Sequence, residues 1–364
     1  MVPPDGRPAD MAAPDESASP RDGRDADEAG QAPALTAAAL DGDRRSLARL
    51  LTAVENRTAI AEAAMRRLYP LAGRAHIVGI TGPPGSGKST LVAALTSVAR
   101  AAGRSVGVIA VDPSSPITGG ALLGDRVRMQ LHAGDRDVFI RSMAARGHAG
   151  GLASTSSAAA AVMDAVGFDL ILIETVGTGQ SEVEVAAAAD TTVVLEAPEM
   201  GDEVQAIKAG LLEVADLVVV NKGDRPGAQR TASQLRAMLV AAPRAGTRGT
   251  ASAEGVSRPV ERPRPKQPVV LVTTAATGDG VPELLAALDA HRSGATAGST
   301  PAARRSRAEA QVWAIVAQRE RERLASDLLR PTRDAILDEV AEHRLDPYTA
   351  ADRLLETLTR EGPR

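Results

Sequence analysis

The stretch HIVGITGPPGSGKST, residues 76–90, most narrows what this 364-residue chain can fold into. An apolar run, the pattern Gly82-x4-Gly87-Lys88-Ser89 and a helix-forming segment follow one another directly, which is the strand–loop–helix order of a phosphate-binding loop. Successive backbone N–H groups curl around phosphate in such a loop, and the helix N-terminus attracts an anion. We expect Lys88 to reach the β- and γ-phosphates and Ser89 to coordinate Mg²⁺. The nucleotide-binding residues of this loop are then Gly82, Pro83, Pro84, Gly85, Ser86, Gly87, Lys88, Ser89 and Thr90.

Short aliphatic runs alternate with helical segments on both sides of this loop. The pattern predicts strands at 76–81, 105–111, 136–140, 168–174, 191–196, 216–220 and 268–273. It predicts helices at 88–102, 152–166, 203–213, 227–241 and 281–291. Such alternation favours an α/β fold of the P-loop NTPase type, with a mainly parallel sheet flanked by helices and helical extensions at both ends.

Changes in composition along the chain suggest the boundaries of its domains and extensions. Residues 1–33 are rich in Pro and acidic residues and read as a disordered acidic tail. A helical extension follows at 34–72, with Asp41 or Asp43 as an N-cap and Asn56 as a break. The nucleotide-binding domain is expected at 73–295.

Two further segments stand apart from this domain pattern. Residues 243–267 are rich in Gly, Pro and Arg and read as a surface loop, whose basic side chains offer a partner contact as the second interpretation. Residues 301–364 form a helical extension that packs on its own domain or on a second subunit. Its apolar spacing predicts one apolar face that would pack in this way: Val312, Ile315, Val316, Leu324 and Leu328.

The bulk composition excludes several classes of function. A net charge of −4 indicates no basic surface for nucleic acid or for an anionic membrane, and only five aromatic residues are present to stack on bases. The chain has no cysteine, so it has neither a disulfide framework nor a thiolate metal site. No apolar run reaches the length of a membrane span, and we expect a soluble, cytoplasmic protein.

The sequence VVVNKGD places Asn221, Lys222 and Asp224 at the end of an apolar strand. The carboxylate of Asp224 can accept hydrogen bonds from the N1–H and the amino group of guanine. Adenine would leave that carboxylate facing a lone pair, and a buried mismatch of this kind discriminates strongly. Asn221 and the Lys222 stem should hold the base and tie this loop to the phosphate loop, so the sequence favours GTP over ATP.

Carboxylates follow two more predicted strands. Asp112 ends one strand, and Asp125 lies beyond it across a Gly-rich loop. Glu174 ends another, where most phosphate-loop nucleotidases carry Asp, and Gly177 follows with a backbone N–H for the γ-phosphate. Because Mg²⁺ prefers oxygen ligands, Ser89 with these three carboxylates predicts a metal site, although Asp125 also suits a helix N-cap. Because the side chain of Glu174 is one methylene longer than that of Asp, it can still serve the metal ion from the same strand end. We therefore interpret Glu174 as characteristic of one class of nucleotidase and not as a damaged site.

Five motifs in sequence order resemble one known family. GPPGSGKST, VDPSSPITGGALLGDRVRM, FIRSMAARGHAGGLA, ETVGTGQSE and NKGD look like the MeaB/ArgK-type methylmalonyl-CoA mutase-associated GTPases. These belong to the metallochaperone branch of phosphate-loop GTPases, which carries Glu in place of the usual Asp. The likeness covers about residues 35–360 and leaves out the N-terminal tail and the 243–267 loop.

The resemblance implies a Mg²⁺-dependent GTPase that converts GTP to GDP and phosphate. Its partner would be an adenosylcobalamin-dependent acyl-CoA mutase of the methylmalonyl-CoA type, for which it gates cofactor loading and which it protects from inactivation. The family is homodimeric through its C-terminal extension and senses the mutase through a mobile switch, here about 197–208. By this resemblance Lys88, Ser89, Asp112, Asp125 and Glu174 form the phosphate and magnesium site, and Asn221, Lys222 and Asp224 the guanine site. In TTAATGDG, Thr274 and Ala275 replace a Ser-Ala start and are expected to offer their backbone to guanine O6.

The catalytic assignments are Lys88, Glu174, Asp125 and Gln180. Gln180 does not directly follow Gly177, so it either approaches the attacking water or has a structural role in its loop. Arg128 and Arg146 are candidates for charge stabilisation, with surface ion pairing as the other interpretation. His148 reads as a loop residue.

Two other functions belong to different classes. A nickel-delivery GTPase shares the Glu variant, but it needs Cys or His ligands, and the five histidines show no ligand spacing. A kinase of a transport protein is the second, although no residue is placed as a base for a protein hydroxyl.

Overall fold

One parallel sheet forms the centre of the structure, a computed structural model that describes residues 30–113, 132, 134–145, 151–175, 181–198, 212, 214–241, 268–298 and 301–360. In this described part, its seven strands lie in the order β3-β2-β4-β1-β5-β6-β7. They are β1 (His76–Thr81), β2 (Val106–Pro113), β3 (Val138–Ala145), β4 (Leu170–Thr175), β5 (Thr191–Glu196), β6 (Leu217–Val220) and β7 (Val269–Val272). The predicted α/β architecture is confirmed.

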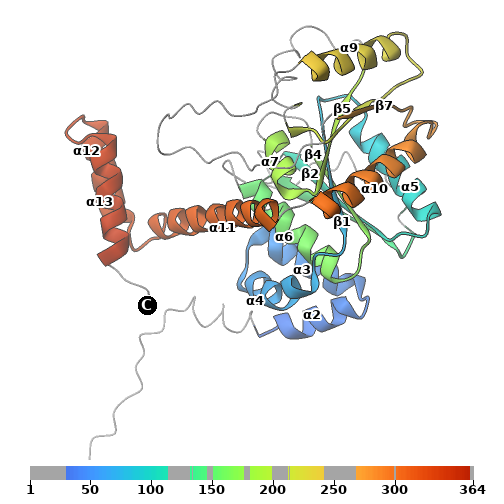
Figure 1. Cartoon of the computed structure of the whole chain (residues 1–364). Coiled ribbons are helices and arrows are strands. Elements are labelled where there is room, and N and C mark those ends of the chain that lie inside the picture. Colours follow the sequence, from blue (N-terminus) through green and yellow to red (C-terminus); the bar gives the residue numbers. More distant parts are fainter. Residues whose placement is uncertain are drawn as a thin grey trace, which may run out of the picture.

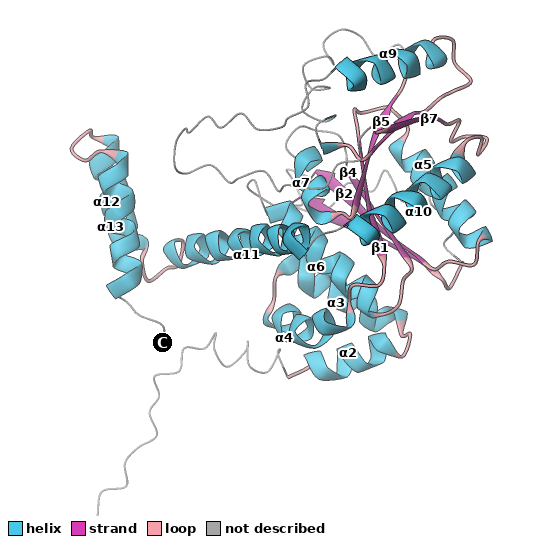
Figure 2. Cartoon of the chain, viewed as in Figure 1, coloured by secondary structure: helices cyan, strands magenta, loops and turns pink. Residues whose placement is uncertain are grey.

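Helices cover both faces of the sheet, which Figure 2 shows as magenta strands between cyan helices. The strands are apolar on both faces, as buried parallel strands must be. In β2, Val106 and Val108 pack with one set of helices, and Ile109 and Val111 pack with the other. The first set is α5 (Lys88–Ala101) and α10 (Val281–Gly298); the second includes α6 (Gly151–Ala165) and α7 (Ser181–Ala188). Helix α9 (Ala228–Ala241) packs against β6 and β7.

The strand order creates a switch point beside β1. The connection after β1 leads to β2, on one side, and the connection after β5 leads to β6, on the other. In open parallel sheets, ligands bind at the carboxyl ends of the strands where the connections diverge in this way. The Gly-rich loop after β1 therefore lies at the edge of the sheet where a ligand is expected.

Most element boundaries agree with the sequence prediction, and the exceptions are informative. Strand β3 continues to Ala145 instead of ending at 140, and α10 continues to Gly298 instead of 291. Most of the predicted helix 203–213 and the whole loop 243–267 lie outside the described residues.

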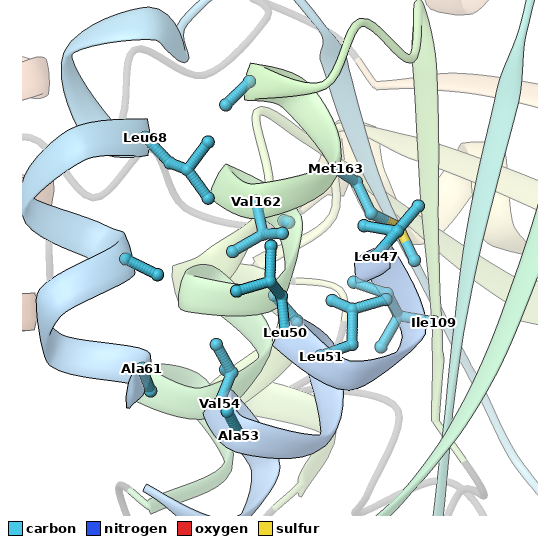
Figure 3. Close-up of a cluster of buried hydrophobic side chains, with 14 of the residues drawn as sticks. Leu47, Leu50, Leu51, Ala53, Val54, Ala61, Leu68, Ile109, Val162 and Met163 are labelled. Carbon is cyan, nitrogen blue, oxygen red and sulfur yellow. The ribbon is translucent and has the colours of Figure 1, made fainter. Parts of the chain in front are cut away.

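The N-terminal extension consists of α2 (Ala32–Leu40), α3 (Arg44–Asn56) and α4 (Ala59–Leu68). It begins inside the stretch assigned to the acidic tail, because Ala32 is fully buried. Asp43 caps α3 by accepting hydrogen bonds from the backbone N–H groups of Arg45 and Ser46, whereas Asp41 follows the end of α2. Figure 3 shows the Leu-rich face of α3 packed against α6 and against Ile109 of β2. The extension thus shares one core with the sheet.

The C-terminal extension leads away from this core. Helix α11 (Pro301–Leu324) extends from the region of α6, and α12 (Arg330–Ala341) and α13 (Pro347–Arg360) lie at its far end (Figure 1). Large apolar side chains are exposed along it: Val312, Trp313, Ile315, Val316, Leu328, Leu337, Tyr348 and Leu355. Four of the five residues of the predicted apolar face are among them. The described helices include none that is both long and apolar enough to cross a membrane.

A buried polar chain closes the sheet at the end opposite the Gly-rich loop. His76 Nε2 lies 2.8 Å from Thr191 Oγ1, which lies 2.8 Å from His291 Nδ1. Burial disfavours the charged imidazolium and lowers the pKa of His76 from 6.5 to about 4, although the nearby carboxylates of Asp190 and Asp289 act in the opposite direction. His76 is therefore neutral in the folded protein at neutral pH.

We expect His76 to make folding stability depend on pH. Because its pKa is lower in the folded state, the unfolded chain binds more protons between pH 6.5 and pH 4. The stabilisation is complete above pH 6.5 and is lost as the pH falls, by about 2 kcal/mol at pH 5 for these two pKa values. Urea unfolding at about pH 7.5 and pH 5 should show this loss in the wild type and a smaller loss in His76→Gln. Equal losses in the two proteins would contradict the assignment.

Candidate nucleotide-binding site

Glycines allow the loop between β1 and α5 to curl tightly. Gly82, Gly85 and Gly87 have φ values of 143°, 78° and 94°, which side-chain-bearing residues rarely adopt. A Cβ on Gly82 would lie 2.1 Å from the carbonyl oxygen of Leu195, and one on Gly87 would lie 2.4 Å from Asn221 Nδ2. Both the backbone angle and the neighbouring atoms therefore require glycine at these two positions.

Lys88 is the first residue of α5 and folds back over the loop. Its Nζ donates hydrogen bonds to the carbonyl oxygens of Gly82, at 2.9 Å, and Pro83, at 3.1 Å. The side chain is buried, so its ammonium charge acts with little screening by water. Together with the N-terminus of α5, it gives the loop a positive field suited to phosphate.

Ser89 and Glu174 meet at the carboxyl edge of the sheet. Ser89 Oγ donates a 2.6 Å hydrogen bond to Glu174 Oε1, and both residues are buried. The contact follows from the topology, because β4 lies beside β1 and Glu174 is in register with Ile80. A hydroxyl and a carboxylate side by side are hard oxygen donors, and this donor chemistry fits Mg²⁺.

The loop after β6 is bound to the phosphate loop. Asn221 Nδ2 donates to the carbonyl oxygen of Ser86 at 2.9 Å, and Lys222 Nζ donates to that of Gly85 at 2.7 Å. Lys222 has φ 58°, a left-handed conformation that turns the chain sharply before Asp224, which is exposed. Asn221 and Lys222 therefore make the connection to the phosphate loop that the sequence suggested.

A third loop, after β7, completes this arrangement. Asn221 Oδ1 accepts from the backbone N–H of Ala275 at 3.0 Å and from Thr273 Oγ1 at 3.2 Å. The N–H of Thr274 donates to the carbonyl oxygen of Asp279 at 2.9 Å. Both amides that the sequence assigned to guanine O6 thus have partners within the chain in this structure. Thr273 was missed from the sequence, and its position directly after an apolar strand was the available signal.

The remaining predicted site residues are placed only in part. The backbone of Asp112 lies near the end of β2, in register with Ala144 of β3. Asp125, Gly177 and Gln180 lie outside the described residues, as do Arg128, Arg146 and His148. Among the residues that are described, no group of three or more His, Cys, Asp or Glu side chains is placed to hold a metal ion.

A phosphate loop hydrogen-bonded to an Asn-Lys-x-Asp loop, both at the carboxyl edge of a parallel sheet, defines the class of phosphate-loop GTPases. Residues 47–328 match the family described as "Methylmalonyl Co-A mutase-associated GTPase MeaB". The chain belongs to this MeaB/ArgK-type family, and it is a GTP hydrolase.

Individual relatives are similar over most of the chain. A protein of Pyrococcus horikoshii that is named provisionally as a GTPase is 45% identical over 318 residues, 87% of this chain and 95% of its own length. The methylmalonic aciduria type A homolog of Mus musculus, a mitochondrial protein, is 32% identical over 333 residues, 87% of this chain and 77% of its own length. The crystal structure of a LAO/AO transport system kinase is similar with a TM-score of 0.60 and 26% identity, covering 91% of this chain and 98% of that one.

Proposed function

We propose that this GTPase is a chaperone and regulator of an adenosylcobalamin-dependent acyl-CoA mutase of the methylmalonyl-CoA type. In this role it gates loading of the cobalamin cofactor and protects the mutase from inactivation. The observation that carries the proposal is the match of residues 47–328 to a family described as mutase-associated. The name of the mouse relative, which refers to methylmalonic aciduria, supports the same partner.

The proposed site binds GTP with Mg²⁺. Hydrolysis joins a water oxygen to the γ-phosphorus, breaks the bond to the oxygen that bridges the β- and γ-phosphates, and releases GDP and phosphate. Ser89, Asp112, Asp125 and Glu174 would hold the metal ion, which when bound neutralises charge on the phosphates. Lys88 leaves the carbonyl groups of Gly82 and Pro83 for phosphate oxygens, and the loops around Asn221 orient the base.

The two other functions have less support. One solved structure of similar fold is that of a transport system kinase, yet the family that matches residues 47–328 is described as a mutase-associated GTPase. A nickel chaperone needs soft or imidazole ligands, whereas the chain has no cysteine and its five histidines show no ligand spacing. A GTPase that serves a cobalamin enzyme requires neither a base for a protein hydroxyl nor a nickel site of its own.

We also propose that the C-terminal extension, residues 301–364, joins two copies of the chain. Trp313 is 63% exposed and Tyr348 is 86% exposed, which is unusual for large aromatic side chains. They belong to helices that extend away from the sheet (Figure 1), where the chain's own core does not cover them. A second copy would bury such a face, and light scattering of the full chain tests this.

The mutase should raise the rate of GTP hydrolysis. No glutamine directly follows Gly177, so the isolated protein should be slow, and groups supplied by a partner are worth on the order of a thousandfold in related chemistry. In the proposed switch 197–208, changes at Glu199, Asp202 or Lys208 should reduce this response and leave GTP affinity nearly unchanged. Turnover with and without the purified mutase measures the response.

Arg230→Gln, which changes an exposed charge on α9, is the matched control and should respond like the wild type. The proposal fails if the mutase does not accelerate the wild-type protein. The assignment of the switch fails if the three variants lose GTP binding instead of the response.

A further inference from the structure

Strand β3 is an edge strand, and helix α3 lies along it. At the start of the strand, Arg44 donates to the carbonyl oxygens of Arg136 and Val138, each at 2.7 Å. At its end, Glu55 Oε1 accepts from the backbone N–H of Ala144 at 3.1 Å. Arg44 is the first residue of α3 and Glu55 is the last but one, about 16 Å apart along a helix. The strand residues that they contact, Val138 and Ala144, lie about 20 Å apart along β3. The helix therefore braces the strand at both ends.

The contact at the end of β3 is held by an ion pair that is shielded from water. Arg141 NH2 lies 2.5 Å from Glu55 Oε2, and the side chains of Arg141 and Glu55 are 19% and 10% exposed. Salt screens such a pair little, and removing one partner leaves the other charge buried. Glu55 is thus fixed by one oxygen on Arg141, while its other oxygen holds the amide of Ala144.

Ala144 of β3 is paired with Asp112 of β2, which is a proposed ligand of the metal ion. The register pairs Asp112 with Ala144 and Pro113 with Ala145. On the other side of β2, the pairing with β4 ends where Val111 meets Thr175. Within the described residues, the backbone of Asp112 is therefore held by β3 alone, and what fixes Ala144 also fixes Asp112.

We propose that Glu55, held by Arg141, is a positioning residue for the GTPase site: through Ala144 it sets the place of the Asp112 backbone at the end of β2. The N-terminal extension then belongs to the frame of the nucleotide site. This inference rests on the proposed metal site, in which Asp112 is a ligand, and is independent of the proposed mutase partner.

Glu55→Ala should weaken the response to Mg²⁺ while leaving the phosphate loop intact. We expect the Mg²⁺ concentration for half-maximal GTP turnover to rise by about tenfold, the lower end of the effects seen when residues that orient metal ligands are changed. Release of a fluorescent GDP analogue should accelerate by a similar factor in Mg²⁺ and stay at the wild-type rate in EDTA. Hydrogen exchange at the Ala144 amide should become faster.

Two variants separate positioning from general stability. Glu55→Gln keeps an oxygen that can accept from the Ala144 amide, so it should restore most of the wild-type Mg²⁺ response. Arg44→Met removes two hydrogen bonds at the opposite end of the same helix and strand. It should lower the melting temperature and leave the Mg²⁺ requirement within about twofold of the wild type, since the Asp112 register is untouched.

The inference is overturned if Glu55→Ala needs no more Mg²⁺ than the wild type or than Arg44→Met. If Glu55→Ala does not fold, Glu55→Asp carries the same test, because it keeps the charge and withdraws the oxygen from Ala144 by one methylene. Wild-type turnover that is independent of Mg²⁺ would overturn the metal site together with this inference. Lack of stimulation by the mutase would affect only the proposed function.

Discussion

The Lys88→Ala variant is expected to lose GTP turnover by a factor on the order of a thousand, because phosphoryl transfer depends on charge that is already in position. In the structure the Lys88 ammonium is buried and donates to the carbonyl groups of Gly82 and Pro83. A γ-phosphate at the loop would receive these hydrogen bonds, and its negative charge would be unbalanced without them. Phosphate release under saturating GTP and Mg²⁺ measures the effect.

Arg100→Met is the matched control for this variant. Arg100 lies on the same helix, α5, and pairs with Asp135 and Asp137 away from the phosphate loop. Removing its charge should leave turnover close to the wild-type value. Full activity of Lys88→Ala, or wild-type activity in excess EDTA, would contradict the site.

Local sequence patterns located most of the fold because each buried strand carries its own signal. Strands β1 and β5 begin and end at the residues that the sequence predicts, 76–81 and 191–196. Strand β3 was predicted too short because Arg141 and Ser142 interrupt its apolar run. In the folded protein this charge is paired with Glu55, which is far away in the sequence. This long-range pairing has no local signature.

The same reasoning explains how much of the site could be predicted. Parallel strands end at one edge of a sheet, so Glu174 and Asn221, each at or just after a strand, had to come close to Ser89, which begins the helix that follows β1. Contacts between loops were harder to foresee. The amide of Ala275 is engaged by Asn221, and Thr273 supports the same side chain, through hydrogen bonds that only the folded loops define.

Guanine selectivity should rest on Asp224, which lies within a turn held by backbone hydrogen bonds. The N–H of Gly223 donates to the carbonyl oxygen of Thr273, and that of Arg225 donates to the carbonyl oxygen of Lys222, both at 2.9 Å. These bonds fix the backbone at Asp224, and its side chain is exposed. Substitution of this side chain should change recognition of the base and leave the supporting backbone in place.

Asp224→Asn is expected to lower the affinity for GTP and GDP by about a hundredfold or more, because two hydrogen bonds to a charged acceptor are lost. Xanthine nucleotides should become the preferred ligands, since their C2 carbonyl can accept from the new amide. Calorimetric titration with GTP and with xanthosine triphosphate measures both changes.

Asp279→Asn, which alters a carboxylate of the adjacent loop, should bind GTP normally. Asp224→Ala should lose GTP without gaining the xanthine nucleotide, which separates a changed hydrogen-bond pattern from a damaged loop. Unchanged GTP affinity in Asp224→Asn would exclude this carboxylate as the guanine-reading group.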